Sequence, residues 1–266
     1  MIRVYLGIVF LLCSTAVFAL DANSELAKKA QNPVENMISI PFDNNWNYNF
    51  TPANRTQYVL NMKPVIPFEL TPSWNLILRT IIPVLHQPEL NPPFNGNRSG
   101  LGDINPSLFL SPGKPREIIW GLGPTMIFPT ATNQQLGQGK YSLGPSLVIL
   151  SMPKQWVLGI LTYNVWSVGG QSNRHSVNQF TLQYFINYNF PHGWYITTQP
   201  VITANWTATS KNRWTVPFGI GVGRVFNIAK QAVNVSIQAY DNVKKPQIAG
   251  SNWQAELNFS FLFPKR

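Results

Sequence analysis

The sequence predicts an all-β protein, a transmembrane antiparallel β-barrel of about twelve strands in up-and-down order. Stretches of roughly ten residues alternate between apolar and polar side chains, as the strands of such a barrel do. Tryptophans stand at the ends of these stretches, where an apolar ring with one N–H donor lies between hydrocarbon and headgroups. The connections alternate in length. The alternative is a soluble all-β protein with aromatic residues at its strand ends.

Eight of the nine tryptophans form two groups. Those that follow short turns with Pro or Gly are Trp74, Trp120, Trp156 and Trp194. Those that flank long polar loops are Trp166, Trp206, Trp214 and Trp253. Two groups at opposite strand ends predict the two aromatic belts of a membrane barrel.

The first residues resemble a secretory signal. Arg3 precedes an apolar stretch over residues 4–12, and Val17-Phe18-Ala19 has the pattern of a cleavage site near Ala19. We therefore expect a signal peptide over residues 1–19 and export to the cell outer membrane. A lipoprotein attachment at Cys13 is the alternative. Cys13 is the single cysteine, so the exported chain would have no disulfide and no catalytic thiol.

Composition narrows the class further. Only 11% of residues are charged, and the net charge is +10. Such a basic balance suggests nucleic acid for a cytoplasmic protein. The export signal argues against that partner, so we expect no nucleic acid.

The alternation is clearest in two segments. One face of the first strand carries apolar and aromatic side chains: Phe180, Leu182, Tyr184, Ile186, Tyr188 and Phe190. Its other face is polar and includes Gln183 and Asn187. In the last segment Leu257, Phe259, Phe261 and Phe263 alternate with Glu256, Asn258 and Ser260. Such an aromatic C-terminal strand resembles the signal that the barrel assembly machinery binds. The expected strands cover residues 40–50, 57–68, 74–85, 100–110, 117–128, 141–150, 156–166, 178–190, 194–206, 214–226, 233–242 and 253–263.

Short connections are expected at residues 70–73, 112–115, 152–155, 191–193 and 227–232, and long ones at 86–99, 129–140, 167–177 and 243–252. The short turns predict the periplasmic end. Several prolines fall inside strands, and Pro106, Pro124 and Pro145 recur in three consecutive strands. Because proline lacks a donor for the strand ladder, we expect bulges or local bends there. Residues 38–266 form the barrel, and residues 20–37 are either a periplasmic tail or a plug in the lumen, with a short helix before Pro33.

The chain resembles a family of bacterial outer-membrane barrels that are described as transporters and associated with the meta-cleavage pathway of phenol degradation. The matching segments include Ile38-Ser39-Ile40-Pro41-Phe42, Pro64-Val65-Ile66-Pro67, Leu101-Gly102-Asp103-Ile104-Asn105-Pro106 and Phe261-Leu262-Phe263-Pro264. The resemblance implies a channel and identifies no solute.

Strand phase predicts that four charged residues face the lumen. By their phase, the residues on the face opposite the apolar one are Lys63, Arg79, Asp103 and Glu256. They should point into the lumen, because an ionised Lys or Arg facing lipid would cost about 2–4 kcal/mol. With Gln183 and Asn187 they are the candidate pore residues. Mixed charges can filter a solute, or they can pair and hold the interior together.

The long loops are basic. Arg174, Lys211, Arg213, Lys244 and Lys245 are candidates for contact with lipopolysaccharide, whose phosphates Arg and Lys bind directly. Attraction of anionic solutes and plain solvation are the alternatives.

Catalysis finds little support. His175, Ser176 and Asn178 form the one cluster to consider for a lipid hydrolase, but adjacent strand residues point to opposite faces. We expect no catalytic residue, no cofactor and no metal site. The sequence thus predicts a passive outer-membrane channel for small, aromatic or hydrophobic molecules. A structural or adhesive surface barrel with an occluded lumen is the main alternative.

Overall fold

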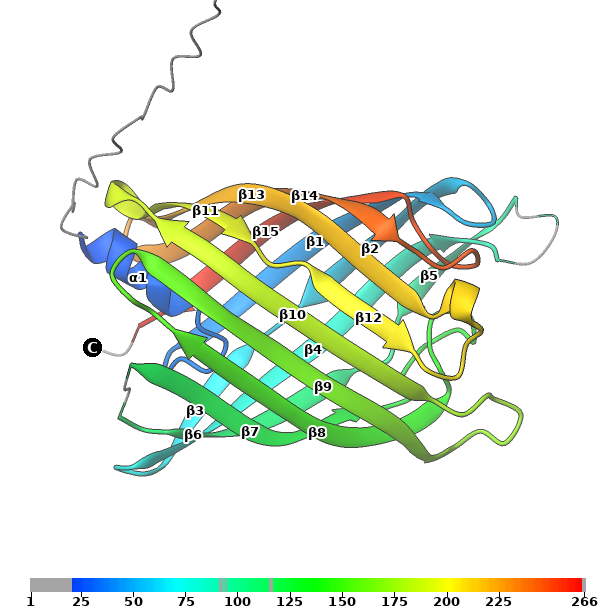
Figure 1. The fold of residues 1–266 in the computed structure, drawn as a ribbon, viewed down its shortest axis with the longest axis horizontal. Helices are drawn as coiled ribbons and strands as arrows, with labels where there is room; N and C mark the ends of the chain where they lie inside the picture. Colours follow the sequence, from blue (N-terminus) through cyan, green and yellow to red (C-terminus); the bar gives the residue numbers. More distant parts are fainter. Residues whose placement is uncertain (1–20, 91–92, 94, 115–116, 265–266) are drawn as a thin grey trace, which may run out of the picture.

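The computed structural model describes residues 21–90, 93, 95–114 and 117–264. The expected signal peptide and its cleavage site lie outside these residues. Within them the strands form one antiparallel sheet that closes into a barrel, because β9 pairs with β10 to complete the ring (Figure 1). The ring has twelve strand positions in the described part of the chain, which confirms the predicted fold class.

Fifteen strand segments occupy these positions in the described chain. They are β1 (Ile38–Phe50), β2 (Arg55–Met62), β3 (Val65–Thr71), β4 (Trp74–Pro88), β5 (Asn97–Leu101), β6 (Asn105–Pro112), β7 (Ile118–Ile127), β8 (Lys140–Ser151), β9 (Trp156–Gly170), β10 (Asn178–Asn189), β11 (Trp194–Thr198), β12 (Val201–Asn205), β13 (Trp214–Ile228), β14 (Gln231–Lys244) and β15 (Trp253–Phe263). The helix α1 (Ala22–Ala30) precedes them, and the 3-10 turns η1 (Pro191–Gly193) and η2 (Ser210–Asn212) lie in connections.

Three of the expected strands are each divided in two. The breaks fall at Lys63-Pro64 between β2 and β3, at residues 102–104 between β5 and β6, and at Gln199-Pro200 between β11 and β12. A proline has no N–H for the ladder, which explains the breaks at Pro64 and Pro200. The registers of β10 with β11 and with β12 form one continuous series, so the two pieces still act as a single wall strand.

The three recurring prolines do not sit at bulges. Pro124 of β7 lies directly opposite Pro145 of β8, and the register continues through both. Among the strand prolines, Pro217 of β13 does adjoin a register shift. At Gly123 and Gly144 the neighbouring strand approaches so closely that a Cβ atom would overlap the carbonyl oxygens of Leu108 and Asn164. The expectation of bulges is therefore wrong at Pro106, Pro124 and Pro145. The wall is closely packed at these glycines.

Side chains alternate as predicted. Ile186 of β10 is 44% exposed on the outer face, whereas its neighbour Asn187 is 1% exposed in the interior. Leu257 and Ser260 of β15 repeat the contrast, at 38% and 2%. Apolar side chains thus cover the outside, the arrangement that a hydrocarbon surrounding requires. The inside carries polar side chains together with two buried apolar clusters.

The two ends of the barrel differ. Short turns lie together at the end where α1 lies, and the long connections lie at the other end (Figure 1). The long connection expected at 86–99 is shorter than predicted, because Pro88 pairs with Asn97 and extends a hairpin between β4 and β5. Trp74 contacts Trp120 near the short turns at 5.9 Å between ring centroids, and Trp206 contacts Trp214 near the long loops at 5.4 Å.

Candidate solute pathway in the barrel lumen

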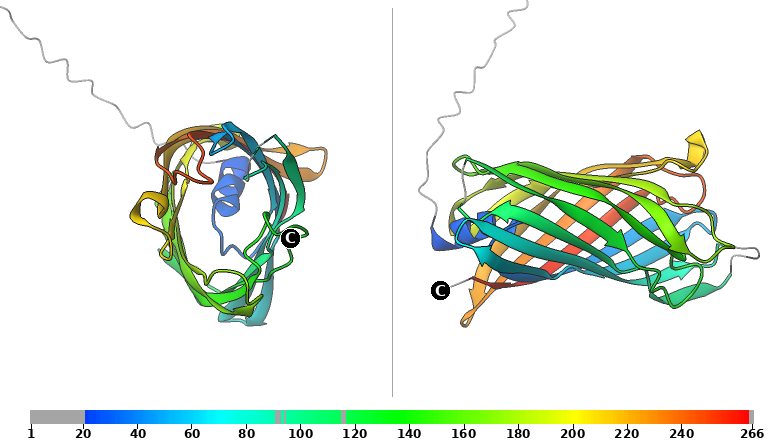
Figure 2. Two further views of the ribbon diagram at one scale, coloured as in Figure 1. Left: turned by 90° about the vertical axis from the view of Figure 1, so that its right-hand side faces the viewer. Right: turned by 90° about the horizontal axis from the view of Figure 1, so that it is seen from below.

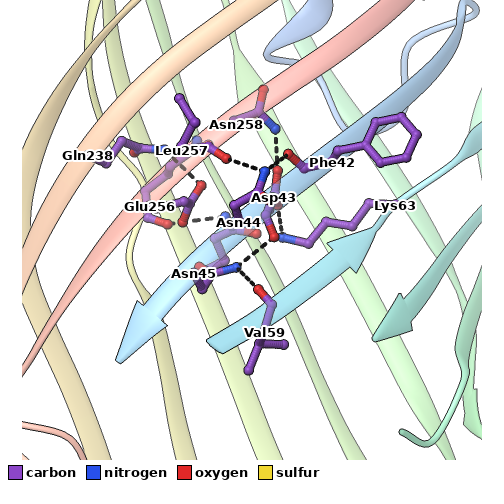
Figure 3. Close-up of polar contacts among 12 residues, drawn as sticks. Phe42, Asp43, Asn44, Asn45, Val59, Lys63, Gln238, Glu256, Leu257 and Asn258 are labelled. Carbon is purple, nitrogen blue, oxygen red and sulfur yellow. Dashed lines mark hydrogen bonds and ion pairs between the residues drawn. The ribbon is translucent and has the colours of Figure 1, made fainter. Parts of the chain in front are cut away.

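A cluster of charged residues lies on one inner wall. Asp43 of β1 and Glu256 of β15 belong to neighbouring strands, with Asp43 opposite Asn258 and Glu256 opposite Asn45. Lys63, at the break between β2 and β3, forms an ion pair with Asp43 (Figure 3). Asn258 donates a hydrogen bond to the same carboxylate, and Glu256 accepts one from Gln238 Nε2 at 2.9 Å.

Arg79 lies on the inner face of β4, opposite Val65 of β3. Its side chain is half-buried. Within the described residues its guanidinium group forms no hydrogen bond and no ion pair. The guanidinium is therefore available to a solute in the lumen.

The opposite wall is polar and uncharged. Gln183 and Asn187 of β10 and Thr197 of β11 face the charged wall across a cavity of about 140 Å³. Phe185 and Tyr195 add aromatic surface to this wall. The structure thus brings Lys63, Arg79, Glu256, Gln183 and Asn187 around one cavity, together with Asp43.

Asp103 is in a different place. It lies at the break between β5 and β6 and does not line the cavity. Its carboxylate accepts hydrogen bonds from the backbone N–H groups of Ala131 at 3.2 Å and Gln138 at 2.6 Å. Asp103 therefore fastens the connection between β7 and β8, so its expected grouping with the other three charges is not found.

Arg174 binds the same connection. Its guanidinium donates to the carbonyl oxygens of Gln138 at 3.1 Å, Gln134 at 2.9 Å and Gly137. Leu136 of this loop is 6% exposed, and Gln138 also contacts the inward-facing Gln179 of β10 at 2.7 Å. The loop is thus held against the inner wall at the long-loop end, and Arg174 is engaged there.

The other basic loop residues lie at the same end. Lys211 in η2 and Lys244 at the end of β14 are exposed, and Lys245 is half-buried. The Arg213 guanidinium lies 5.9 Å from the ring of Trp206. These four residues thus lie together at the long-loop end of the barrel.

The N-terminal segment lies inside the short-turn end of the barrel (Figure 2). Asp21 caps α1 by accepting the N–H of Ser24 at 2.9 Å. The Ser24 hydroxyl donates to the carbonyl oxygen of Phe190 at 2.8 Å and accepts the N–H of Gly193 at 3.1 Å. The amides of Gln31 and Asn189 pair at 3.0 and 3.1 Å.

Apolar contacts complete this docking. Ala27 of α1 and Met37 pack with inward-facing Tyr195, Val225 and Leu262. On the other side Val34 joins an apolar cluster with Ile77, Phe109 and Phe185 among its members. The segment therefore contacts walls on both sides of the lumen, and residues 30–33 form part of the cavity lining.

Three glycines of β13 face inward, at positions 219, 221 and 223. A Cβ atom at Gly223 would overlap the ring of Tyr195, and one at Gly221 would meet the Gln238 side chain. At Gly219 the backbone of β14 leaves no room for a Cβ atom, so neighbouring side chains or backbone fill the space beside all three glycines.

The residues considered for a lipid hydrolase are not brought together in the described chain. His175 and Ser176 are exposed in the loop between β9 and β10, and the structure gives no hydrogen bond between them. Asn178 instead accepts from Asn164 Nδ2 at 3.0 Å. The described residues also contain no group of three His, Cys, Asp or Glu that could hold a metal ion. None of their helices is long and apolar enough to cross a membrane.

Sequence reasoning missed Asp43, Asn258 and Thr197. The signal for Asp43 was available, since it shares the inner phase of β1 with Ser39 and Asn45. The inward-held loop around Leu136 had no comparable signal, because its anchors Asp103 and Arg174 lie far away in sequence.

Comparisons with known proteins support the fold. No protein-family model matches the chain, and no curated protein does. An outer-membrane channel of Pseudomonas putida F1 is similar in structure, with a TM-score of 0.62, 14% sequence identity and coverage of 85% of this chain and 94% of that one. The NanC porin has a TM-score of 0.54 and 8% identity, covering 86% and 100%. These likenesses show the fold of an outer-membrane barrel.

A third comparison is weaker. The outer-membrane phospholipase A of Escherichia coli has a TM-score of 0.41 and 12% identity, and it covers 91% of this chain and 98% of that one. This likeness carries no argument about function. The association with phenol degradation is likewise not shown by these comparisons and stays a prediction.

Proposed function

We propose that the protein is an outer-membrane channel that admits small molecules by passive diffusion. The observation that carries this proposal is the polar cavity of about 140 Å³ inside a wall whose outer face is apolar. Such a site offers a solute contacts that hydrocarbon does not. The fold shared with two outer-membrane channels supports it.

The residues that line the cavity indicate which class of solute it can bind. Most of the residues around the cavity are polar or charged, and Phe185 and Tyr195 supply its aromatic surface. Small polar solutes therefore fit this lining better than the aromatic or hydrophobic molecules that the family resemblance implies. Lys63, Arg79 and Glu256 are the proposed filter, with Gln183 and Asn187 on the facing wall.

We propose that residues 21–37 act as a plug that must move for solutes to pass. Its polar contacts can be exchanged for water: one helix cap, one buried serine and one amide pair. Its apolar contacts are few, made mainly by Ala27, Val34 and Met37. Loop 128–139 narrows the other end. A structural or adhesive surface barrel with a permanently occluded lumen is favoured by the same two segments, so it remains the second candidate.

We also propose two partners, lipopolysaccharide and the barrel assembly machinery. Lys211, Arg213, Lys244 and Lys245 form the proposed contact with lipopolysaccharide, whereas Arg174 is assigned to loop 128–139. The outward-facing aromatic residues of β15 are proposed to serve recognition by the barrel assembly machinery.

A liposome-swelling assay tests the channel. Proteoliposomes with the mature chain are diluted into glycerol, arabinose, glucose or phenol, alongside a variant that weakens the plug contacts (Asp21→Asn, Ser24→Ala, Gln31→Ala). The swelling of protein-free liposomes, which glycerol and phenol also enter, is subtracted. We expect swelling that decreases with solute size and is faster for the variant. If neither protein admits any solute, the barrel is sealed and the structural or adhesive alternative replaces the channel.

A further inference from the structure

The luminal cavity has two chemically different walls. One wall is charged: it carries Arg79 of β4, Lys63 at the break between β2 and β3, Asp43 of β1 and Glu256 of β15. These strands are neighbours in the barrel wall. Thr197 and Asn187 come from β11 and β10 on the other side. Its volume of about 140 Å³ is close to that of a cavity that holds a benzene ring, roughly six non-hydrogen atoms.

Four buried polar atoms around this cavity have no hydrogen-bond partner within the described chain. They are Asn187 Nδ2, Thr197 Oγ1, Asn258 Oδ1 and Ser260 Oγ. Their residues are 1%, 1%, 9% and 2% exposed. Buried polar groups in proteins are nearly always hydrogen-bonded, so four such atoms around one cavity indicate a polar occupant.

Two charged groups on the cavity wall also have no ion-pair partner. Lys63 and Asp43 neutralise each other. Glu256 has a neutral partner in Gln238, and Arg79 has neither a hydrogen bond nor an ion pair among the described residues. The guanidinium of Arg79 and the carboxyl group of Glu256 therefore both face the cavity. Their strands, β4 and β15, are three positions apart in the barrel wall, with about 4.8 Å between neighbouring strands.

We propose that this cavity binds a small zwitterion of the amino-acid class. The carboxylate of the solute binds Arg79, with Asn187 Nδ2 as a second donor. Its ammonium group binds Glu256, with Asn258 Oδ1 as a second acceptor, because the Nδ2 of Asn258 is already bound to Asp43. An anion would leave Glu256 unpaired and a cation would leave Arg79 unpaired, whereas a zwitterion matches both. This inference deepens the proposed function, since the site lies on the proposed pathway.

Competition binding tests the proposal without requiring transport. Radiolabelled alanine is bound to the detergent-solubilised mature protein and displaced by lactate, 2-amino-1-propanol or propane-1,2-diol. These three-carbon solutes lack the ammonium, the carboxylate or both. We expect alanine to bind saturably and to compete best, with each missing charge weakening competition roughly tenfold or more.

Two variants assign the charges to residues. Arg79→Gln should remove the preference for alanine over 2-amino-1-propanol, and Glu256→Gln should remove its preference over lactate. Arg55→Gln is the matched control, because Arg55 binds the carbonyl oxygen of Gly96 in an exposed position at the long-loop end. Heat-dependent mobility on SDS gels checks that each variant is folded, and the wild-type order of competitors stands as a test if one is not.

Three outcomes would overturn the proposal. Absence of saturable alanine binding would mean that the cavity holds water, and equal competition by all four solutes would mean that charge is not recognised. Lactate competing better than alanine would make this an anion site. Glycerol permeation without alanine binding removes the zwitterion site and leaves the channel, whereas alanine binding without any permeation removes the channel and leaves the site.

Discussion

Ser24 is the single residue that joins α1 most closely to the barrel. It is fully buried, and its hydroxyl serves both the Phe190 carbonyl and the Gly193 N–H of the turn at η1. Replacing it with alanine leaves both backbone groups without a partner, at a cost of about 1–3 kcal/mol.

Ser24→Ala should therefore expose α1 more often. We expect trypsin to cleave after Lys28 or Lys29 roughly 5- to 100-fold faster, since cleavage follows the population of the undocked helix. Mass spectrometry of the trimmed N-terminus measures the rate. Asn23→Ala is the control, because the bond of Asn23 to Asn227 is exposed. Equal rates for Ser24→Ala and the wild type would rule out this role for Ser24.

Asp21 makes the docking of α1 depend on pH. Hydrogen bonds from the backbone and side chain of Ser24, and then contact with His192, hold the pKa of the Asp21 carboxyl below its ordinary value of 3.8. A lowered pKa in the docked state means that docking is favoured above 3.8 and loses that contribution as the pH falls through the docked pKa.

Hydrogen–deuterium exchange of residues 22–30, corrected for the intrinsic effect of pH, should thus show lower protection in acid. Asp21→Asn should lower protection at neutral pH and remove most of the acid-dependent loss. A variant that keeps the wild-type pH profile would show that another group is responsible.

At the scale of elements, the close approach of β8 and β9 depends on one missing side chain. A Cβ atom at Gly144 would overlap the carbonyl oxygen of Asn164, and backbone cannot move aside as a flexible side chain can. Gly169 in the same pair of strands has no atom within 4 Å of the corresponding position.

Gly144→Ala should therefore disturb the pairing of β8 with β9, while Gly169→Ala should be tolerated. We expect a lower yield of folded barrel for the first variant alone, measured as the heat-modifiable band after refolding into detergent or lipid. Comparable yields for both variants would show that the wall relaxes around a methyl group.

The elements also show where sequence reasoning succeeded and where it did not. Period-two alternation predicted the inner and outer faces of β10 and β15, because alternate side chains of a barrel strand face either the lipid or the lumen. The prolines inside strands marked Pro64 and Pro200 as places where the ladder is disturbed, but the sequence did not show that the ladder resumes in the same register beyond them. The hairpin that ends at Pro88 and Asn97 was hidden as well, because its residues lack the alternation of a membrane strand.

At the scale of the whole molecule, strand phase located Arg79 and Glu256 on the cavity wall. It could not separate them from Asp103, since phase fixes the side of the wall and not the height along the barrel or the partner. The engagement of Arg174 by loop 128–139 depends on contacts between residues distant in sequence. The sequence therefore predicted five basic loop residues as one group, and the structure shows that Arg174 among them binds a loop of the barrel itself.

The whole molecule is a polar lumen inside an apolar wall, with α1 lying in one end and a fastened loop at the other. The central claim is that solutes and ions pass when α1 leaves its site. Conductance would then depend on the contacts that hold α1 against the barrel as well as on the charged residues of the cavity.

Single-channel recording in planar bilayers tests this claim most directly. The wild type is compared with the variant that carries Asp21→Asn, Ser24→Ala and Gln31→Ala. Our account predicts longer or larger openings in the variant, and a changed ion preference when Arg79→Gln is added. Indistinguishable currents from the wild type and the variant, with α1 shown to be undocked, would contradict it.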